Sequence, residues 1–237
     1  MLRKVLIGGF QKSSLIDFKG RIAAIVFLQG CNFCCPYCHN PELIRPMTAD
    51  PLDFDSILEF LKTRTGKLDG VVITGGEPTL HKDLPELIRS VKELNFEVKL
   101  DTNGTNPKVV SELLGEGLID YVAMDIKASL ENYQKVTVKP VDIEKIKNSI
   151  SMLVNGNIEY EFRTTVVDKL LCYDDFIRIN EMFKEFAPKK IKAYYLQKFQ
   201  PSKHVNENYI NAKTFEDDEF DKLVKLFGQT AEFVGVR

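Results

Sequence analysis

Short runs of β-branched and aromatic residues alternate along the chain with stretches whose apolar side chains recur three and four positions apart. Such runs predict β-strands, and the longer spacing predicts amphipathic helices. The predicted strands are 23–30, 70–75, 97–102, 121–125, 160–167 and 192–199. Helical patterns cover 57–61, 84–91, 109–114, 143–153, 176–186 and 215–227. Each predicted strand therefore precedes a predicted helix, and the repeating unit is βα.

Most of these strands are nearly continuous apolar runs, a pattern typical of a parallel sheet covered by helices. With right-handed crossovers, six βα units curl into a partial barrel, two units short of the closed eight-unit form. We expect an N-terminal β extension over 1–20, a barrel core over 21–200 and a C-terminal loop and helix over 201–237. No low-complexity linker divides the chain, so we expect a single α/β domain over 1–237.

Composition excludes several classes of protein. With 237 residues, of which 44% are hydrophobic and 28% charged, the chain has an average globular composition. Its formal net charge of −2 offers no positive field for nucleic acid. The apolar run 22–28 is too short to span a membrane, and 1–9 is too short for a secretory signal. We expect a cytoplasmic protein that binds neither nucleic acid nor membrane.

Four of the five cysteines, Cys31, Cys34, Cys35 and Cys38, fall within eight residues of one another. This clustering indicates metal or redox chemistry, because disulfide scaffolds distribute their cysteines along short secreted chains. Two abutting C-x₂-C pairs could form a zinc knuckle, although the adjacent Cys34 and Cys35 make closure around one ion strained. Used as C-x₃-C-x₂-C, Cys31, Cys35 and Cys38 could instead hold a [4Fe–4S] cluster with one iron open. Cys34 is then a bystander, and Cys172 a buried or half-buried free thiol.

Polar residues and glycines mark the carboxyl ends of successive predicted strands, where α/β barrels carry their active groups. Any one of them could be ordinary turn or helix-cap chemistry, but five strands in succession indicate a ligand site. The candidates beyond the cysteines are Gly75, Gly76, Glu77, Asp101, Thr102, Met124, Asp125, Lys127 and Arg163.

Two motifs make the sequence resemble the radical S-adenosylmethionine enzymes. The C-x₃-C-x₂-C triplet has an aromatic residue, Tyr37, directly before its last cysteine, and Gly-Gly-Glu-Pro at 75–78 matches the second motif of that superfamily. The resemblance spans nearly the whole chain and implies a partial (β/α)₆ barrel with a cluster on Cys31, Cys35 and Cys38. It implies that the open iron chelates S-adenosylmethionine, which the reduced cluster cleaves to methionine and a 5′-deoxyadenosyl radical.

The resemblance also gives the strand-end residues roles around S-adenosylmethionine. Glu77 can accept hydrogen bonds from the methionine ammonium group. Lys127 or Arg163 can neutralise the methionine carboxylate, and Arg163 is the better bidentate donor. Asp125 can meet the ribose or the ammonium group, and Tyr37 can offer its backbone or its ring to the adenine. The two glycines before Glu77 let backbone approach a ligand closely.

Within that superfamily, the sequence is most similar to the glycyl-radical activating enzymes. The similarity lies in 38–42, in Asp-Thr-Asn-Gly at 101–104 and in Met-Asp-Ile-Lys at 124–127. In formate-lyase activating enzymes, the equivalent residues help to form a monovalent-cation site beside the cofactor. Their counterparts here are Asp101, Thr102, Met124 and Asp125. Oxygen atoms of Asp and Thr suit a hard cation, whereas a methionine would contribute its backbone carbonyl.

Residues 8–20 resemble the longer class of activating proteins for anaerobic ribonucleoside-triphosphate reductase. The implied reaction is hydrogen-atom abstraction from a glycine of that partner enzyme, with a flavodoxin- or ferredoxin-type electron donor. The sixth strand lacks the histidine that formate-lyase activators carry there, and Gln197 or Gln200 would have to replace it. Three alternatives stay open: an activator of another glycyl-radical enzyme such as a formate lyase, a radical enzyme acting on a small molecule, and a zinc-stabilised binding module.

Overall fold

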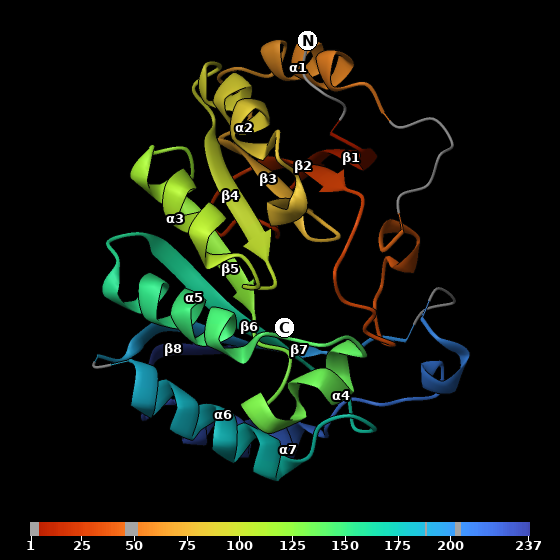
Figure 1. Ribbon diagram of the computed structural model, residues 1–237, viewed down its shortest axis with the longest axis vertical. Coiled ribbons are helices and arrows are strands. Elements are labelled where there is room, and N and C mark those ends of the chain that lie inside the picture. Colours follow the sequence, from red (N-terminus) through yellow and green to blue (C-terminus); the bar gives the residue numbers. More distant parts are fainter. Residues whose placement is uncertain (1–4, 46–51, 188, 202–204) are drawn as a thin grey trace. The chain divides into compact units, whose positions relative to one another are not determined.

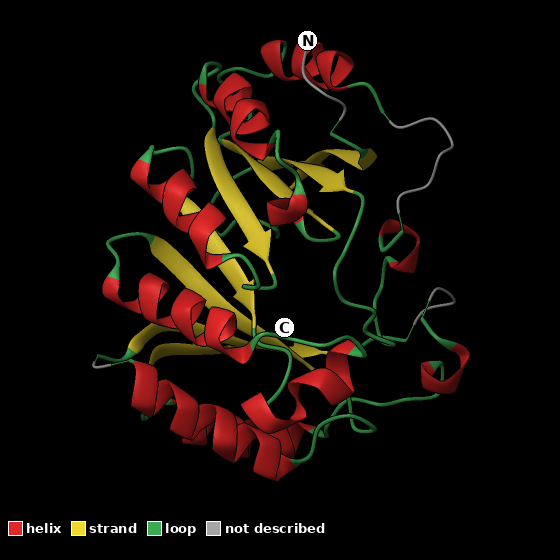
Figure 2. Cartoon of the chain, in the orientation of Figure 1, coloured by secondary structure: helices red, strands yellow, loops and turns green. Residues whose placement is uncertain are grey.

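The computed structural model describes residues 5–45, 52–187, 189–201 and 205–237 (Figure 1). Helices and strands alternate along these residues, as the hydrophobic periodicity predicts (Figure 2). The chain forms two compact units. The first consists of Met1–Asn32, Glu42–Thr102 and Lys108–Val122, and the second of Phe33–Pro41, Asn103–Pro107 and Ala123–Arg237. The single domain expected from the sequence stays a prediction.

In the part of the chain that the structure describes, eight strands follow one another in sequence order in the sheet, so the sheet is open, with β1 and β8 at its ends. They are β1 (Ile7–Ser14), β2 (Ala23–Leu28), β3 (Gly70–Gly75), β4 (Glu97–Thr102), β5 (Tyr121–Asp125), β6 (Glu159–Val166), β7 (Ile191–Lys198) and β8 (Ala231–Val236). β1 pairs with β2 in the antiparallel sense, whereas β2–β3, β3–β4, β6–β7 and β7–β8 are parallel. The predicted α/β class, the six core strands and the N-terminal β extension are confirmed.

The first unit packs helices against an almost wholly apolar part of the sheet. Its helices are α1 (Phe54–Lys62), α2 (Leu84–Lys92) and most of α3 (Pro107–Gly115), with short 3₁₀ turns at Pro41–Leu43 and Pro78–Leu80. Val71, Val72 and Ile73 in the middle of β3 are all buried, as expected of a parallel strand that is covered on both faces. α2 turns its buried side chains inward at the three-and-four spacing visible in the sequence.

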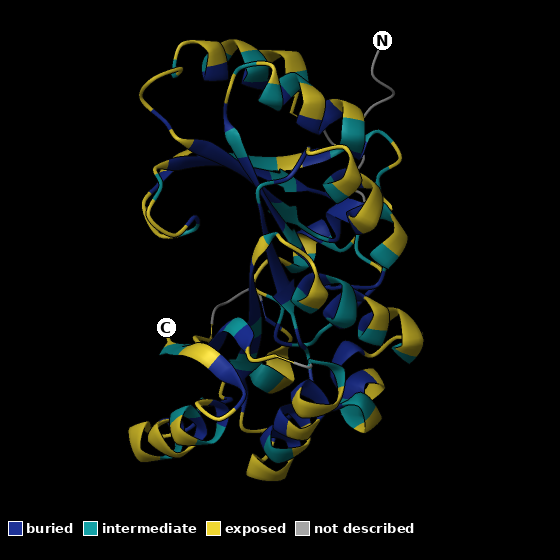
Figure 3. Cartoon of the chain, turned by 90° about the vertical axis from the view of Figure 1, so that its left-hand side faces the viewer, coloured by how far each residue is buried: buried dark blue, intermediate teal, exposed yellow. Residues whose placement is uncertain are grey.

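The second unit is built around aromatic side chains. Its helices are α4 (Tyr133–Thr137), α5 (Ile143–Asn155), α6 (Tyr173–Phe186) and α7 (Asp217–Phe227), with 3₁₀ turns at Leu130–Asn132 and Glu207–Tyr209. Phe183 of α6 packs against Phe162 of β6 and Tyr194 of β7, with ring centroids 5.3 Å apart in both pairs, and Tyr194 lies 4.4 Å from Phe227 of α7. The helices turn their buried faces toward the sheet and expose their outer faces (Figure 3).

Two elements differ from the expectation. The C-terminal segment, predicted as a loop and a helix, continues beyond α7 into β8, which hydrogen-bonds to β7. β8 shows a weak strand pattern because it is an edge strand with an exposed Phe233 and a glycine at 235, where a Cβ would approach the Tyr195 ring to 2.7 Å. The short helix α4 was not predicted either.

Among the described residues, no helix has the length and apolar character needed to cross a membrane. The cytoplasmic location stays a prediction.

Replacing Phe183 by alanine should lower the free energy of unfolding by about 3–5 kcal/mol, because the side chain is fully buried and leaves a cavity among aromatic rings. Ile210→Ala is the control, since Ile210 is 44% exposed, and it should change stability by at most about 0.5 kcal/mol. Urea denaturation followed by circular dichroism measures both variants. Equal effects of the two substitutions would contradict the packing described here.

Candidate active site

The turn after β3 is bound to the end of β2 by backbone contacts that only glycine permits. Gly75 has a φ of +115°, and a Cβ there would lie 2.4 Å from the Leu28 backbone. A Cβ on Gly76 would lie 2.1 Å from the carbonyl oxygen of Gly30. Gly76 N donates to Leu28 O, and Glu77 N donates to Gly30 O, both at 2.8 Å. The two glycines therefore hold the Gly-Gly-Glu-Pro motif against the residues that precede Cys31.

Glu77 is completely buried and begins the 3₁₀ turn at Pro78–Leu80. Its Oε1 accepts hydrogen bonds from the Thr79 backbone N–H at 3.1 Å, from the Thr79 hydroxyl and from the Thr102 hydroxyl at 2.9 Å. These donors fix the carboxylate at the carboxyl ends of β3 and β4. Acceptance of a ligand ammonium by Glu77 stays a prediction.

Asp101 forms an ion pair that the sequence analysis did not identify. Lys99, two residues earlier on β4, is only 3% exposed, and its Nζ lies 3.3 Å from Asp101 Oδ1. The same Nζ donates to the carbonyl oxygen of Asp17. The available signal was a lysine inside an apolar strand, at the spacing that places it on the same face as Asp101.

Cys31 belongs to the first unit, where the chain leaves β2. Gly30 N donates to Leu43 O at 2.7 Å, and Cys31 N donates to Ile44 O at 3.0 Å. His81, which the sequence left without a role, places Nε2 2.7 Å from the carbonyl oxygen of Gln29. The backbone of residues 29–31, which leads into the cysteine motif, is thus fixed by these three hydrogen bonds.

Cys34, Cys35 and Cys38 belong to the second unit. Cys38 N donates to Cys35 O at 3.0 Å, which forms a turn between these two cysteines. Cys34 N donates to the carbonyl oxygen of Thr137 at 2.9 Å, at the end of α4. Helix α4, which the sequence did not predict, therefore anchors the cysteine loop through Thr137. The next residue, Val138, ends the helix with a φ of 59°, which is unusual for a β-branched residue.

Within the described ranges, no three His, Cys, Asp or Glu side chains gather closely enough to hold a metal ion. Cys31 lies in one compact unit, whereas Cys35 and Cys38 lie in the other. The joint ligation of one cluster by the three cysteines therefore stays a prediction, as does the bystander role of Cys34.

Asp125, at the end of β5, is held by two cations. Its Oδ1 lies 2.8 Å from Arg163 Nε, and its Oδ2 lies 2.9 Å from Lys127 Nζ. Burial raises the pKa of Asp125, but Arg163 and Lys127 outweigh this effect and hold the pKa well below its usual range. Burial likewise lowers the pKa of Lys127, and Asp125 more than compensates, so the ammonium pKa lies above its usual range. Two cations on one carboxylate leave a positive charge that suits an anionic ligand group.

This ion cluster acts on the cysteine loop. Burial raises the pKa of the Cys35 thiol to about 11, and the positive charge of Lys127 opposes that rise. Tyr37 is 5% exposed, and its ring centroid lies 5.9 Å from Lys127 Nζ. A thiolate that needs compensation, next to a fixed cation, is suitable chemistry for a ligand of an iron–sulfur cluster.

Two further residues complete this part of the second unit. Met124 is fully buried and packs against Gly104, where a Cβ would come within 2.1 Å of Met124 Cε. Its thioether is therefore used in packing. Tyr133 of α4, missed by the sequence analysis, accepts a hydrogen bond from Lys127 N at 3.3 Å and donates one to Asp125 O at 3.4 Å. It fixes the backbone on either side of the Asp-Ile-Lys segment.

The remaining expectations have mixed outcomes. Cys172 is a free thiol, but it is exposed rather than buried, because it caps α6 and its Sγ contacts Asp175 Oδ2 at 3.2 Å. His39 Nε2 lies 3.0 Å from the carbonyl oxygen of Gln200, just beyond β7. The cysteine loop thus brings a histidine to the end of the strand that has none of its own.

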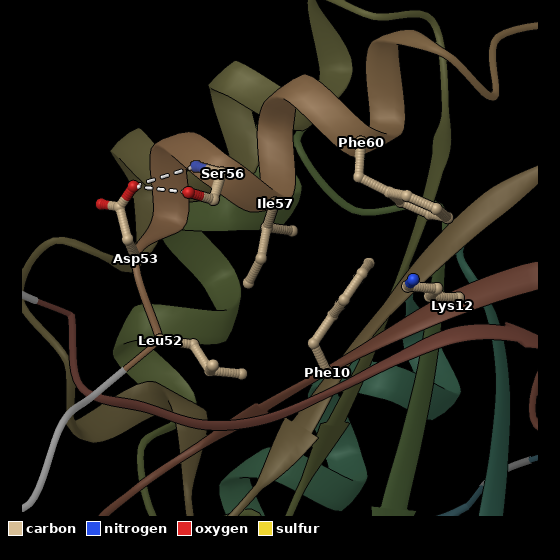
Figure 4. A pocket seen from close by; sticks show the side chains of 7 residues that line it. All are labelled: Phe10, Lys12, Leu52, Asp53, Ser56, Ile57 and Phe60. Atoms are coloured by element: carbon tan, nitrogen blue, oxygen red, sulfur yellow. Dashed lines mark hydrogen bonds between the residues drawn. The ribbon is translucent and has the colours of Figure 1, made fainter.

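A pocket of about 390 Å³ lies elsewhere in the first unit, between α1 and β1 (Figure 4). None of the predicted site residues lines it. Its one carboxylate, Asp53, caps α1 by accepting hydrogen bonds from Ser56 N at 3.1 Å and Ser56 Oγ at 3.0 Å. The pocket is therefore separate from the candidate chemistry.

Comparison with known proteins identifies the class. The family described as the radical SAM superfamily matches residues 25–182. A "Putative glycyl-radical enzyme activating enzyme" of Methanocaldococcus jannaschii is 35% identical over 243 residues, which cover 99% of this chain and 96% of that protein. The 7-carboxy-7-deazaguanine synthase of Aquifex aeolicus is 34% identical over 99 residues, 42% of this chain and 44% of that enzyme.

Among solved structures, Streptococcus suis SuiB bound to S-adenosylmethionine has a TM-score of 0.64 at 15% identity, over 87% of this chain and 48% of that chain. This likeness shows the fold. The chain belongs to the radical SAM superfamily, whose members use a [4Fe–4S] cluster and S-adenosylmethionine. Within it, the near-full-length similarity is to the class of glycyl-radical enzyme activating enzymes. The predicted superfamily, fold, enzyme class and two of the cofactors, the [4Fe–4S] cluster and S-adenosylmethionine, are confirmed, and a zinc-stabilised binding module is disfavoured. The monovalent cation stays a prediction.

Replacing Asp125 by alanine should destabilise the protein by about 2–4 kcal/mol, because two partly buried cations lose their shared partner. The loss should stay constant between about pH 5 and 8, since a carboxylate with a lowered pKa contributes fully above its unfolded pKa of about 4 and loses its effect as the pH falls further. Asp217→Ala, at an exposed pair with Lys198, is the control, at about 0–1 kcal/mol. Denaturant titrations at several pH values measure both, and similar losses for the two variants would contradict the assignment.

Proposed function

We propose that this protein is a glycyl-radical activating enzyme whose partner is an anaerobic ribonucleoside-triphosphate reductase. The observation that most supports it is the partly buried group of charges on Lys127, Asp125 and Arg163 beside the Cys35 loop, in a chain with a near-full-length relative of that class. These charged side chains place a fixed positive charge beside a cysteine that could hold the [4Fe–4S] cluster. A zwitterionic cofactor bound to that cluster requires both features.

Cys31, Cys35 and Cys38 would hold the [4Fe–4S] cluster, which when bound and reduced would supply the electron for cleavage of S-adenosylmethionine to methionine and a 5′-deoxyadenosyl radical. Around it, Arg163 and Lys127 bind the methionine carboxylate. Their geometry is set in advance, because Asp125 holds both of them, at 2.8 and 2.9 Å.

The other predicted residues complete the cofactor site in this proposal. Glu77, fixed by Thr79 and Thr102, accepts the methionine ammonium group. Gly75 and Gly76 hold that carboxylate in place through their contacts with the end of β2. Tyr37 is buried beside Lys127 and provides the surface on which the adenine is recognised.

The 5′-deoxyadenosyl group would take a hydrogen atom from a glycine Cα of the partner, giving 5′-deoxyadenosine and a glycyl radical stabilised between the amide nitrogen and the carbonyl of that glycine. A glycine carries no side chain, so a loop with glycine at its tip can approach the open sheet more closely than a loop with a larger residue there. A flavodoxin- or ferredoxin-type protein supplies the electron.

An exposed loop in the first unit favours the hypothesis that the substrate is a protein. Leu15 and Ile16 are 74% and 84% exposed, although Ser14 before them and Phe18, two residues after them, are buried. Ser14 Oγ accepts a hydrogen bond from Ile16 N at 3.2 Å and donates one to the Asp17 carboxylate. In this proposal, the two exposed aliphatic side chains contribute to the surface that contacts the partner protein.

A small-molecule radical reaction is the second candidate, because the deazaguanine synthase of Aquifex aeolicus is similar over part of the chain. An activator of a formate lyase is a variant of the first candidate. The two classes differ in what promotes formation of 5′-deoxyadenosine: a glycine-bearing polypeptide in one, a metabolite in the other.

Anaerobic reconstitution tests the ligand set. Cys35→Ala should abolish the [4Fe–4S] spectrum and the cleavage of S-adenosylmethionine, because one of three protein thiolates is lost. Cys34→Ala, the matched neighbour, should keep both, since its backbone contact to Thr137 does not need the side chain. Loss of the cluster in Cys34→Ala would show that the ligand set is wrong.

Incubation with purified anaerobic ribonucleoside-triphosphate reductase tests the partner. The reduced enzyme with S-adenosylmethionine should generate the electron paramagnetic resonance doublet of a glycyl radical in the reductase. A reductase whose glycine is replaced by alanine should give no doublet. Formation of the doublet on a formate lyase instead, or turnover promoted by small metabolites alone, would contradict the proposed partner.

A further inference from the structure

We propose that the ammonium group of Lys99 takes the place of the monovalent cation that the family resemblance puts at Asp101. The protein would then bind S-adenosylmethionine without needing sodium or potassium. This inference rests on the proposed function, because the cation in question accompanies the bound cofactor.

Lys99 lies on β4 with Asp101 on the same face of the strand, because alternate residues of a strand share a face. The two side chains are 4% and 14% exposed, and Nζ lies 3.3 Å from Asp101 Oδ1. A lysine so deeply buried is stable only with a charged or hydrogen-bonding partner. Asp101 therefore already carries a positive charge next to its carboxylate.

The ammonium group is fixed by its surroundings. Besides Asp101, it donates to the carbonyl oxygen of Asp17, whose carboxylate accepts a hydrogen bond from the Ser14 hydroxyl. Phe18, the next residue, is fully buried and packs against Tyr121 with ring centroids 5.7 Å apart. The Lys99 Nζ lies 5.9 Å from the centroid of that same Tyr121 ring. These contacts hold Nζ on the Asp101 side of the strand.

A metal cation at Asp101 would meet this ammonium group. Both would compete for the same carboxylate, and like charges only a few ångströms apart repel strongly away from bulk water. Asp125, the other carboxylate of the predicted cation site, is already bound by Arg163 and Lys127 in its own unit. Each carboxylate thus has a protein cation beside it within its own unit, and the residues around Asp101 do not fit a further cation.

The test compares salts on the reconstituted holoenzyme. The dissociation constant of S-adenosylmethionine is measured by isothermal titration calorimetry in sodium, potassium or tetramethylammonium chloride at equal ionic strength. The three values should agree within about twofold, because there is no coupling to a bound cation. An affinity higher by about tenfold in sodium or potassium than in tetramethylammonium would overturn the inference.

Lys99→Met should make the protein dependent on a cation. In tetramethylammonium chloride its affinity should fall by about tenfold or more, and sodium or potassium should restore it by binding Asp101. Lys92→Met, which removes a half-buried lysine paired with Asp120 at 2.7 Å, is the matched control and should show no salt preference. A loss in Lys99→Met that no cation restores would mean that Lys99 is only structural and would overturn the inference. Should Lys99→Met not fold, the wild-type comparison decides by itself.

Failure of the proposed function gives a different result. A holoenzyme that binds no S-adenosylmethionine in any of the salts would contradict that function and not the role of Lys99. Sodium-23 relaxation of the wild-type chain then decides the inference: no saturable sodium binding supports it, and saturable binding that Asp101→Asn removes overturns it.

Discussion

The pairing of partly buried charges governs the candidate site. Arg163 and Lys127 contact the two oxygens of Asp125 and hold the pKa of that carboxyl well below its usual range, and Asp125 in turn keeps both cations in place. Removing one member of such a set leaves the others charged in a medium that solvates them poorly. The three side chains therefore hold one another in a fixed arrangement. The Cys35 thiol is close enough to have its pKa changed by this charge.

Backbone geometry imposes a second constraint in the first unit. Gly75 and Gly76 allow the turn after β3 to approach the end of β2 more closely than any side chain would permit. The motif that looks in sequence like a ligand loop is thus also a connection between neighbouring strands. This connection fixes the backbone position of Glu77, and its carboxylate accepts hydrogen bonds from the hydroxyl groups of Thr79 and Thr102. Structural and functional requirements fall on the same residues.

The two compact units divide the cysteine motif. Cys31 leaves β2 with its backbone bonded to the segment at residues 43–44, whereas Cys34 is bonded to α4. In the proposed function, the three cluster ligands come from both units, so cluster assembly would depend on the folding of both, as in metal sites where binding and folding are coupled. Within each unit, a strand-end carboxylate is paired with lysine or arginine: Asp101 of β4 with Lys99, and Asp125 of β5 with Lys127 and Arg163.

The sequence alone determined the repeating βα pattern, the positions of the six core strands to within about two residues and the identity of the superfamily, because hydrophobic periodicity and the spacing of cysteines are local properties. Most of the candidate residues could be named for the same reason. The ion pair of Lys99 with Asp101, the role of Tyr133 and the approach of His39 to the end of β7 join residues whose relation depends on the folded chain. β8 likewise becomes a strand through pairing with β7, and its own residues signal this only weakly. Only the tertiary structure decided these features, because charge compensation, close packing and strand pairing arise from neighbours in space.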